Sequence, residues 1–460
     1  MDVVNTGCCG ELLTPSCPTD CVGCTQHGTR PCCVLIEVTA RCNLGCPVCY
    51  ADAQGMSENR SQSPSSLPRD PSLETIAFWL DKLYDRAGAC HIQLSGGEPT
   101  VRDDLEAIIR LVRAKGFSYI QLNTNGIRLA KDPHLAVKLK DAGLTCVFLQ
   151  FDGMRDEVYR VLRGADLLAI KQAAVEACEQ AMLPVILVPT LLRGVNEKEL
   201  VPIITYGISK SPTVRGIHIQ PMARFGRAQV AAERITLTQV CALLEEQSNM
   251  MIQASHFSRG NAEHPECSFN AHYFITDEGR LEPSGVVRPA CCSQAEGMET
   301  CCDGVETRSA EGAETCCGGD ETQNAEYTDT CCGSDETRNA ECTEPRLAYT
   351  EPRLAYAEPH VAYTEPRFDS VRHAQEVQAR RWGTNLSEMV DERPPAGTMD
   401  ELLWQMKARS FALTGMAFMD AENLDRNRLQ RCYLFIIDPQ GELIPFCAYN
   451  IAHRQRAQHQ

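Results

Sequence analysis

Three cysteines between residues 42 and 49 are spaced so that their thiolates can reach the same metal centre. Cys42, Cys46 and Cys49 follow a C-x3-C-x2-C pattern, and Tyr50 comes directly after the last of them. A [4Fe–4S] cluster has four iron corners, so three cysteine ligands leave one iron open to a small chelating molecule. A structural zinc site instead needs a fourth protein ligand nearby. We therefore interpret the three cysteines as cluster ligands, with a zinc knuckle or buried free thiols as the alternatives.

A second group of cysteines comes shortly before the first. Cys21 and Cys24 form a C-x2-C knuckle, and Cys17 and Cys32 bring the set to four. Four such ligands can close a tetrahedral site of the zinc or rubredoxin-iron kind. Cys33 lies directly beside Cys32, so the sequence leaves open which of the two is the fourth ligand.

The composition limits the environment and the partners. The N-terminal residues lack the basic and apolar regions of a secretory signal, so we expect a cytoplasmic protein with reduced cysteines. The 26 cysteines among 460 residues are far above ordinary usage, which favours metal binding. A formal net charge of −17 argues against a nucleic-acid partner. The chain has no apolar run long enough to span a membrane, and peripheral membrane contact stays open.

Strand and helix patterns alternate after the first cysteine group. Short apolar, β-branched runs predict buried strands, and the segments between them carry apolar residues at helical spacing. The six strands are expected over residues 33–39, 91–94, 119–122, 145–150, 185–188 and 216–220. Six such units predict an α/β fold in which a parallel sheet curls into a partial (β/α)6, TIM-like barrel.

Polar motifs follow these strands, at the ends where such barrels gather their functional residues. The segment Ser95, Gly96, Gly97, Glu98 and Pro99 follows the second strand. Its glycines permit close backbone approach, and Glu98 with the loop carbonyls can accept an ammonium group. Further motifs follow the later strands at residues 123–126, 150–153, 193–196 and 220–227. For each motif alone, turn chemistry is the alternative explanation.

Residues 32–227 resemble the core of the radical S-adenosylmethionine (SAM) superfamily. Cys42, Cys46 and Cys49 match its cluster ligands, whose open iron takes the amino and carboxyl groups of SAM. The resemblance implies a set of cofactor-binding residues: Ser95, Gly96, Gly97, Glu98 and Pro99 around the methionine amine, Gln220 near adenine, and Asn125 near the ribose or carboxylate.

Residues 17–49 resemble, more narrowly, the family of archaeal tetraether lipid synthase and the pterin-methylating radical SAM proteins. That family shares a C-P-x-x-C-x-x-C segment, a His-containing stretch, and a cysteine leading into an I-E-V-T strand. Here these are Cys17, Cys21, Cys24, His27 and Cys32. The resemblance implies additional iron–sulfur sites in the C-terminal region.

The C-terminal region supplies candidates for those sites. A turn at residues 438–441 predicts a hairpin of two strands, over 431–437 and 443–450, with Cys432 and Cys447 flanking the turn. With Cys267 they give three candidate ligands for one or two auxiliary [4Fe–4S] clusters. A fourth ligand is left open between His264, Cys291 and substrate. A helix is expected over 237–252.

Residues 291–369 interrupt this pattern with cysteine pairs and a TEPRLAY repeat. Between Glu296 and Glu344 there are fourteen acidic residues against two arginines, with almost no large apolar side chains. Such a segment buries too little surface to order itself, and we predict a disordered insertion. The expected organisation is a metal-binding segment (1–32), a radical SAM core (33–230), the insertion, and a two-part auxiliary region (231–290 and 370–460).

The resemblance implies that the cluster cleaves SAM to a radical that abstracts hydrogen from an unactivated C–H bond. We expect carbon–carbon bond formation or methylation on a lipid-like or pterin-like small molecule, with ferredoxin or flavodoxin as electron donor. No single catalytic side chain is predicted. The alternatives are a peptide-modifying radical SAM enzyme and, outside catalysis, a metal-storage or metal-sensing protein on the same fold.

Overall fold

The computed structural model describes residues 31–51, 54–55, 70–228, 232–259, 263–284, 372, 375–379, 382–383, 386, 394–395 and 397–454. All of them belong to one compact unit, formed by residues 1–287 and 366–460. The second unit, residues 288–365, contains no described residue. The predicted ligands Cys17, Cys21 and Cys24 and the predicted insertion at 291–369 therefore lie outside the described residues.

Six parallel strands form the centre of one sheet, as the alternating pattern predicts. They lie side by side in chain order, each parallel to its neighbour. Their bounds are β1 (Cys33–Thr39), β5 (His91–Gly96), β6 (Ile120–Thr124), β7 (Cys146–Gln150), β8 (Val185–Val188) and β10 (Val214–Pro221). The predicted α/β fold with a partial barrel is confirmed.

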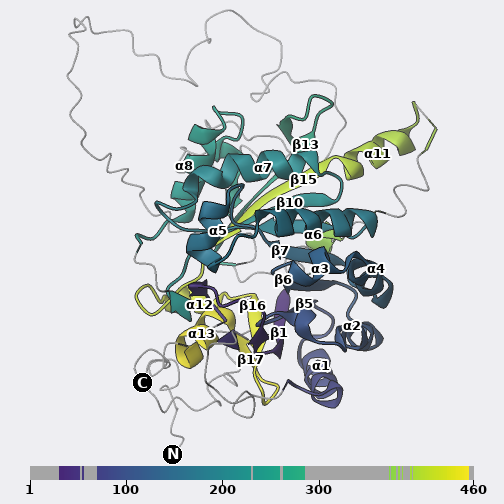
Figure 1. Cartoon of the computed structure of the whole chain (residues 1–460), viewed down its shortest axis with the longest axis vertical. Helices are drawn as coiled ribbons and strands as arrows, with labels where there is room; N and C mark the ends of the chain where they lie inside the picture. The colour runs from purple at the N-terminus through teal and green to yellow at the C-terminus, as the bar shows by residue number, and fades with distance from the viewer. Residues whose placement is uncertain are drawn as a thin grey trace, which may run out of the picture. The chain divides into compact units, whose positions relative to one another are not determined.

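Helices cover the outer face of this sheet (Figure 1). Ile92 and Leu94 of β5 point outward into one core that also contains Ile76 and Leu80 of the first helix. The large helices are α1 (Leu73–Ala87), α2 (Leu105–Ala114), α4 (Pro133–Ala142), α6 (Leu168–Gln180) and α7 (Leu200–Ser209). Two short helices that the periodicity missed, α3 (Ile127–Lys131) and α5 (Asp156–Arg163), follow the polar ends of β6 and β7.

Polar side chains on part of the inner face of the sheet bond to one another, beside an apolar cluster that includes residues of β7 and β8. Gln93 Nε2 donates to Asn123 Oδ1 over 2.5 Å, and Asn123 Nδ2 donates to Ser95 Oγ over 3.3 Å. His218 Nδ1 lies 2.8 Å from Thr414 Oγ1. Buried polar groups need such partners, so the strands bring side chains of matching chemistry to neighbouring positions.

C-terminal strands extend this sheet at both edges. β15 (Ser410–Met416) pairs in parallel with β10, and β16 (Leu434–Ile437) pairs in parallel with β1. Outside them lie antiparallel strands, so that the order is β12-β13-β15-β10-β8-β7-β6-β5-β1-β16-β17. Within the described residues the two outermost strands do not pair, so the barrel is open. Residues 417–433, the bridging segment, connect its two edges.

The remaining elements are short or lie near the edges. The bounds of these remaining elements are β2 (Arg41–Cys42), β3 (Val48–Cys49), β4 (Gln54–Gly55), β9 (Thr190–Leu191), β11 (Arg227–Ala228), α8 (Leu237–Gln247), β12 (Ser258–Arg259), β13 (Ser268–Ile275), β14 (Leu281–Pro283), α11 (Met399–Ala408), α12 (Arg426–Gln430), β17 (Leu443–Pro445) and α13 (Phe446–Arg454). Two of them, β3 and β11, form a separate antiparallel pair.

Two predicted elements of the C-terminal half need correction. The helix expected over 237–252 ends at Gln247, and Asn249 and Met250 adopt positive φ angles of 50° and 66° that break it. The strand expected over 443–450 ends at Pro445, where α13 begins. Cys447 and Ile451 are both buried four residues apart, which is helical spacing.

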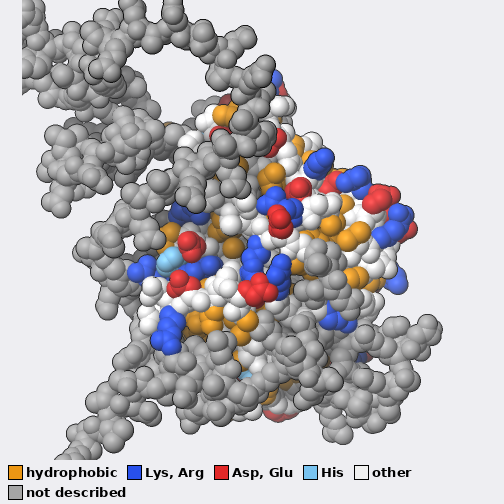
Figure 2. Space-filling model, turned by 90° about the vertical axis from the view of Figure 1, so that its left-hand side faces the viewer, with side chains coloured by type: hydrophobic (Ala, Val, Ile, Leu, Met, Phe, Trp, Pro, Cys, Tyr) orange, Lys and Arg blue, Asp and Glu red, His pale blue; other side chains and the backbone are white. Residues whose placement is uncertain are grey.

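The surface on the side of α8, α12 and α13 mixes charges of both signs with apolar side chains (Figure 2). The described part of this face shows no broad basic patch of the kind that a phosphate backbone requires. None of the described helices is long and apolar enough to cross a membrane.

Asp420 anchors the bridging segment from a fully buried position. It accepts hydrogen bonds from the backbone N–H of Arg224 over 2.7 Å and from Arg234 Nη2 over 2.6 Å. Glu422 also pairs with Arg234, but its side chain is 60% exposed. The two acids therefore share a partner and differ in burial.

The substitution Asp420→Ala is expected to lower the free energy of unfolding by roughly 2 kcal/mol, because it leaves buried donors without an acceptor. Glu422→Ala is the matched control and should leave the urea-unfolding midpoint almost unchanged. Equal destabilisation by the two substitutions would contradict this assignment.

Candidate functional site

Residues 40–50, the cysteine loop, lie at the C-terminal end of β1 beside the ends of β5 and β6. Gly97 N–H donates to the carbonyl of Thr39, and Glu98 N–H donates to the carbonyl of Arg41, both over 2.8 Å. Asn125 Nδ2 donates to Asn43 Oδ1 over 2.7 Å. The polar motifs after the second and third strands thus converge on the loop that carries Cys42, Cys46 and Cys49.

The two glycines after β5 allow the closest of these contacts. A Cβ atom at Gly97 would lie 2.1 Å from the carbonyl oxygen of Arg41, and one at Gly96 would lie 2.2 Å from that of Thr39. Gly96 also has a φ of +115°, which other residues rarely adopt. The close approach that the sequence predicts for these glycines includes contact with the cysteine loop.

The carboxylate of Glu98 connects the turn after β5 to the end of β6 by hydrogen bonds. The side chain is 1% exposed and accepts hydrogen bonds from Thr100 N–H, Thr100 Oγ1, Thr124 Oγ1 and Asn125 N–H. Three of these bonds reach Oε1 and one reaches Oε2, so Oε2 can accept a further hydrogen bond. The contact of Glu98 with an ammonium group stays a prediction.

The other predicted cofactor-binding residues lie at the same rim. Tyr50 Oη lies 2.7 Å from Ser95 Oγ, and Pro99 is the first residue of a short 3-10 helix. Asn125 Oδ1 accepts a hydrogen bond from Ile127 N–H, which orients its amide. Gln220 is near the end of β10, where its N–H donates to the carbonyl of Pro189. Their roles toward a cofactor stay predictions.

The thiols of the cysteine loop lie within electrostatic reach of one another. Burial raises the pKa of Cys42 to about 12; a hydrogen bond from Leu44 N–H opposes this rise, and the Cys46 and Cys49 thiols add to it. Burial also raises the pKa of Cys46, whereas the nearby guanidinium of Arg163 lowers it. Metal binding replaces the proton of such a thiol, which removes this burial penalty.

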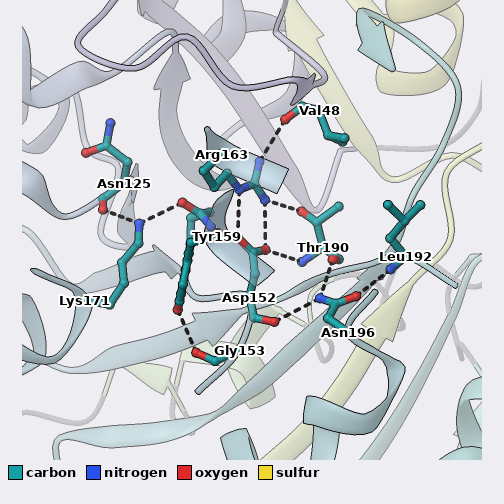
Figure 3. A network of polar contacts seen from close by, with 11 residues as sticks. Val48, Asn125, Asp152, Gly153, Tyr159, Arg163, Lys171, Thr190, Leu192 and Asn196 are labelled. Atoms are coloured by element: carbon teal, nitrogen blue, oxygen red, sulfur yellow. Dashed lines mark hydrogen bonds and ion pairs between the residues drawn. The ribbon is translucent and has the colours of Figure 1, made fainter. Parts of the chain in front are cut away.

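A buried ion pair lies beside this loop and was not predicted from the sequence (Figure 3). Asp152, at the end of β7, accepts from Nε and Nη2 of Arg163 on α5, over 2.7 and 2.9 Å. Arg163 Nη1 also donates to the carbonyl of Val48, within the cysteine loop. The sequence shows an acid and an arginine eleven positions apart, but pairing them requires knowing where α5 packs.

Lys171 on α6 is a second buried cation near the loop. Its Nζ donates to the carbonyl of Asn125 over 2.5 Å and to Gln150 Oε1 over 2.7 Å. Burial lowers its pKa to about 7, while Asp152 opposes that shift. A negatively charged group bound at the cysteine loop would favour its charged form.

Cys32 and Cys33 lie at the opposite end of β1 from the cysteine loop. Both backbone N–H groups donate to the carbonyl of Tyr433, over 2.9 and 3.2 Å. The Cys33 thiol lies 3.7 Å from Gln93 Oε1. A metal centre that includes Cys32 is therefore separate from the cysteine loop, and the choice between Cys32 and Cys33 stays open.

The three C-terminal candidate ligands lie around the bridging segment. Arg428 Nε donates to the sulfur of Cys267 over 3.4 Å, and Met419 N–H donates to the sulfur of Cys447 over 3.3 Å. Burial raises the pKa of Cys432, and the neighbouring Cys447 and Cys267 thiols raise it further. Three cysteines from distant parts of the sequence are thus neighbours.

The donor set at the cysteine loop fits an iron–sulfur cluster. The described residues hold no group of three or more His, Cys, Asp or Glu side chains placed to bind one metal ion. A four-iron cluster makes a different demand, because each cysteine binds its own iron and the sulfurs are spread around the cluster. Three neighbouring thiols meet that demand in number and type.

Comparison with known proteins identifies the family. Residues 36–206 match the sequence profile of the Radical SAM superfamily. The 7,8-dihydro-6-hydroxymethylpterin dimethyltransferase of Methanocaldococcus jannaschii is 29% identical over 468 residues, covering 96% of this chain and 81% of that protein. Residues 36–206 form a radical SAM domain. The protein is an enzyme of the radical SAM type, and this domain implies a [4Fe–4S] cluster and SAM.

Other similar proteins match this radical SAM enzyme over its core. A probable GTP 3′,8-cyclase of Methanothermobacter marburgensis is 36% identical over 166 residues, covering 36% of this chain and 50% of the cyclase. The crystal structure of Streptococcus suis SuiB bound to S-adenosylmethionine is 12% identical, with a TM-score of 0.38 and coverage of 50% of each chain.

Substituting Gly97 by Ala tests the close contact in this radical SAM site. The added Cβ would meet backbone, so the cysteine loop must move, and we expect the affinity for iron to fall roughly tenfold or more. Gly45→Ala is the matched control within the same loop, since nothing lies within 4 Å of its Cβ position. The measurement is iron retained against a chelator after anaerobic reconstitution, and equal retention would refute the expectation.

Proposed function

We propose that Cys42, Cys46 and Cys49 hold a [4Fe–4S] cluster with SAM at its open iron, and that the enzyme methylates a pterin-like small molecule. The similarity to a pterin dimethyltransferase carries this proposal, because it extends over 96% of the chain and is not confined to the SAM-binding core. The pterin-like substrate is favoured over the lipid-like one because the relative that spans most of the chain is a pterin dimethyltransferase.

The residues around the cysteine loop have different roles, some in binding SAM and others in holding the loop in place. Gly96 and Gly97 hold the end of β5 against the cysteine loop, which exposes their carbonyls to the amine of SAM. Glu98 fixes that turn to the end of β6, and Ser95 holds the ring of Tyr50 by a hydrogen bond. When bound, the cluster would supply the electron for cleavage of SAM. The side chains that line the barrel would limit the access of water to the bound cofactor.

The C-terminal cysteines are proposed to hold an auxiliary [4Fe–4S] cluster. Cys267, Cys432 and Cys447 supply three thiols, and the proximity of these side chains across the bridging segment supports a shared centre. The N-terminal cysteines with Cys32 are proposed to hold a rubredoxin-like iron or zinc. An electron donor such as ferredoxin or flavodoxin would serve these centres.

Iron and sulfide analysis tests the assignment of the clusters. Wild-type protein reconstituted without oxygen should hold more than about four irons, and the Cys42/Cys46/Cys49 triple Ala variant should lose about four of them. That variant should also fail to cleave SAM. Cys178→Ala, a buried cysteine of α6, is the control and should keep the wild-type iron count. An unchanged count in the triple variant would refute the ligand assignment.

Product analysis tests the substrate class. Reduced enzyme is incubated with 7,8-dihydro-6-hydroxymethylpterin and excess SAM, so that one SAM molecule gives 5′-deoxyadenosine and methionine while another would donate each methyl group. The expected products are 5′-deoxyadenosine and a pterin that is heavier by one or two methyl groups. The triple variant should give neither product. Cleavage of SAM without any change in the pterin would retain the radical SAM assignment and reject the pterin substrate.

A further inference from the structure

Arg163 contacts three separate parts of the site from one buried position. The residue is 8% exposed and stands at the C-terminal end of α5. Its fork donates twice to Asp152, which is fully buried. The same guanidinium donates to the carbonyl of Val48 over 2.9 Å and to Thr190 Oγ1 over 2.8 Å. These contacts join β7, β9 and the cysteine loop (Figure 3).

The contact with Val48 acts on the half of the cysteine loop that carries two of the thiols. Val48 lies between Cys46 and Cys49, so fixing its carbonyl restricts the backbone on both sides. Packing strengthens this restraint, because Val48 shares a buried apolar cluster with Val158 and Leu162 of α5. The end of α5 therefore abuts the loop through both a hydrogen bond and packing.

The shape of the side chain matters as much as its charge. A guanidinium presents five donors in a planar fork, whereas a lysine ammonium presents three donors on a flexible stem. Arg163 uses its fork for two bonds to Asp152 and two further bonds in other directions. A lysine at this position would keep the charge and lose most of that geometry.

We propose that Arg163 is a positioning residue for the cluster: it fixes the Cys46–Cys49 half of the cysteine loop and places a buried positive charge beside it. This inference rests on the assignment of Cys42, Cys46 and Cys49 as cluster ligands. A positive charge near a cluster favours its reduced, more negative form, so the same contact raises the reduction potential. Position and charge are therefore two separable contributions of one side chain.

Four variants separate these contributions. Arg163→Lys keeps the charge and loses the fork, and Arg163→Gln loses both. The double variant Asp152→Asn/Arg163→Gln removes both charges, so it leaves no unpaired buried ion that would endanger folding. Arg160→Gln is the matched control, because Arg160 lies one turn earlier on α5 and pairs with Asp166 at the exposed surface.

Three measurements read out the variants. In metal-free protein, hydrogen exchange of the amides of Cys46, Val48, Cys49 and Tyr50 should be at least several-fold faster in Arg163→Lys than in wild type. After reconstitution, Arg163→Lys should lose iron to a chelator roughly tenfold to a hundredfold faster, with a midpoint potential near that of wild type. Arg163→Gln should lose iron as fast and show a more negative potential. The double variant should show a smaller shift of the same sign.

The outcomes distinguish the two contributions from each other and from the ligand assignment. If Arg163→Lys exchanges amides and releases iron at the rates of Arg160→Gln, the positioning role is overturned. If Arg163→Gln and the double variant keep the wild-type potential, the charge role is overturned. Failure of the ligand assignment has its own signature, an unchanged iron count in the Cys42/Cys46/Cys49 triple Ala variant, and does not depend on Arg163.

Discussion

The backbone contact between the ends of β1 and β5 is the constraint from which the site is built. The carbonyl of Arg41 lies so close to Gly97 that no side chain fits between them, and the neighbouring N–H groups bond across the same gap. Because parallel strands bring their C-terminal ends to one edge, this contact fixes the cysteine loop over the barrel mouth. Glu98 then couples the contact to β6 through the N–H of Asn125.

A buried ion pair also holds the cysteine loop in place, through contacts separate from those of β5. Asp152 and Arg163 form an ion pair without appreciable exposure, and such a pair costs free energy unless further hydrogen bonds satisfy it. Here Thr190 and Val48 supply those bonds. Arg163 of this pair lies beside the cysteine loop, where its guanidinium fixes the Val48 carbonyl and faces thiols that would carry negative charge in a cluster.

The periodic parts of the fold were predictable from the sequence, and the contacts between distant parts were not. Strands such as 185–188 carry continuous apolar residues, and polar motifs follow the strands at the edge of the sheet where the cysteine loop lies. The strand expected through residue 450 failed because a short apolar run does not distinguish strand from helix. The partnership of Arg163 with Asp152 and Val48 depends on tertiary packing of a helix only eight residues long, for which the sequence gives no local signal.

The pairing of β16 with β1 has a consequence for how the enzyme is made. Leu434 lies opposite Cys33 in the sheet, so β1 can complete its pairing only after β16 has been synthesised. Contacts between residues so far apart in sequence form slowly, and domains fold as their segments become available during synthesis. The cysteine loop and the elements that contact it are complete once β7 and α5 have been synthesised, whereas Cys432 and Cys447 are synthesised later. The two groups of cysteines are therefore assembled at different times, the C-terminal group after the other.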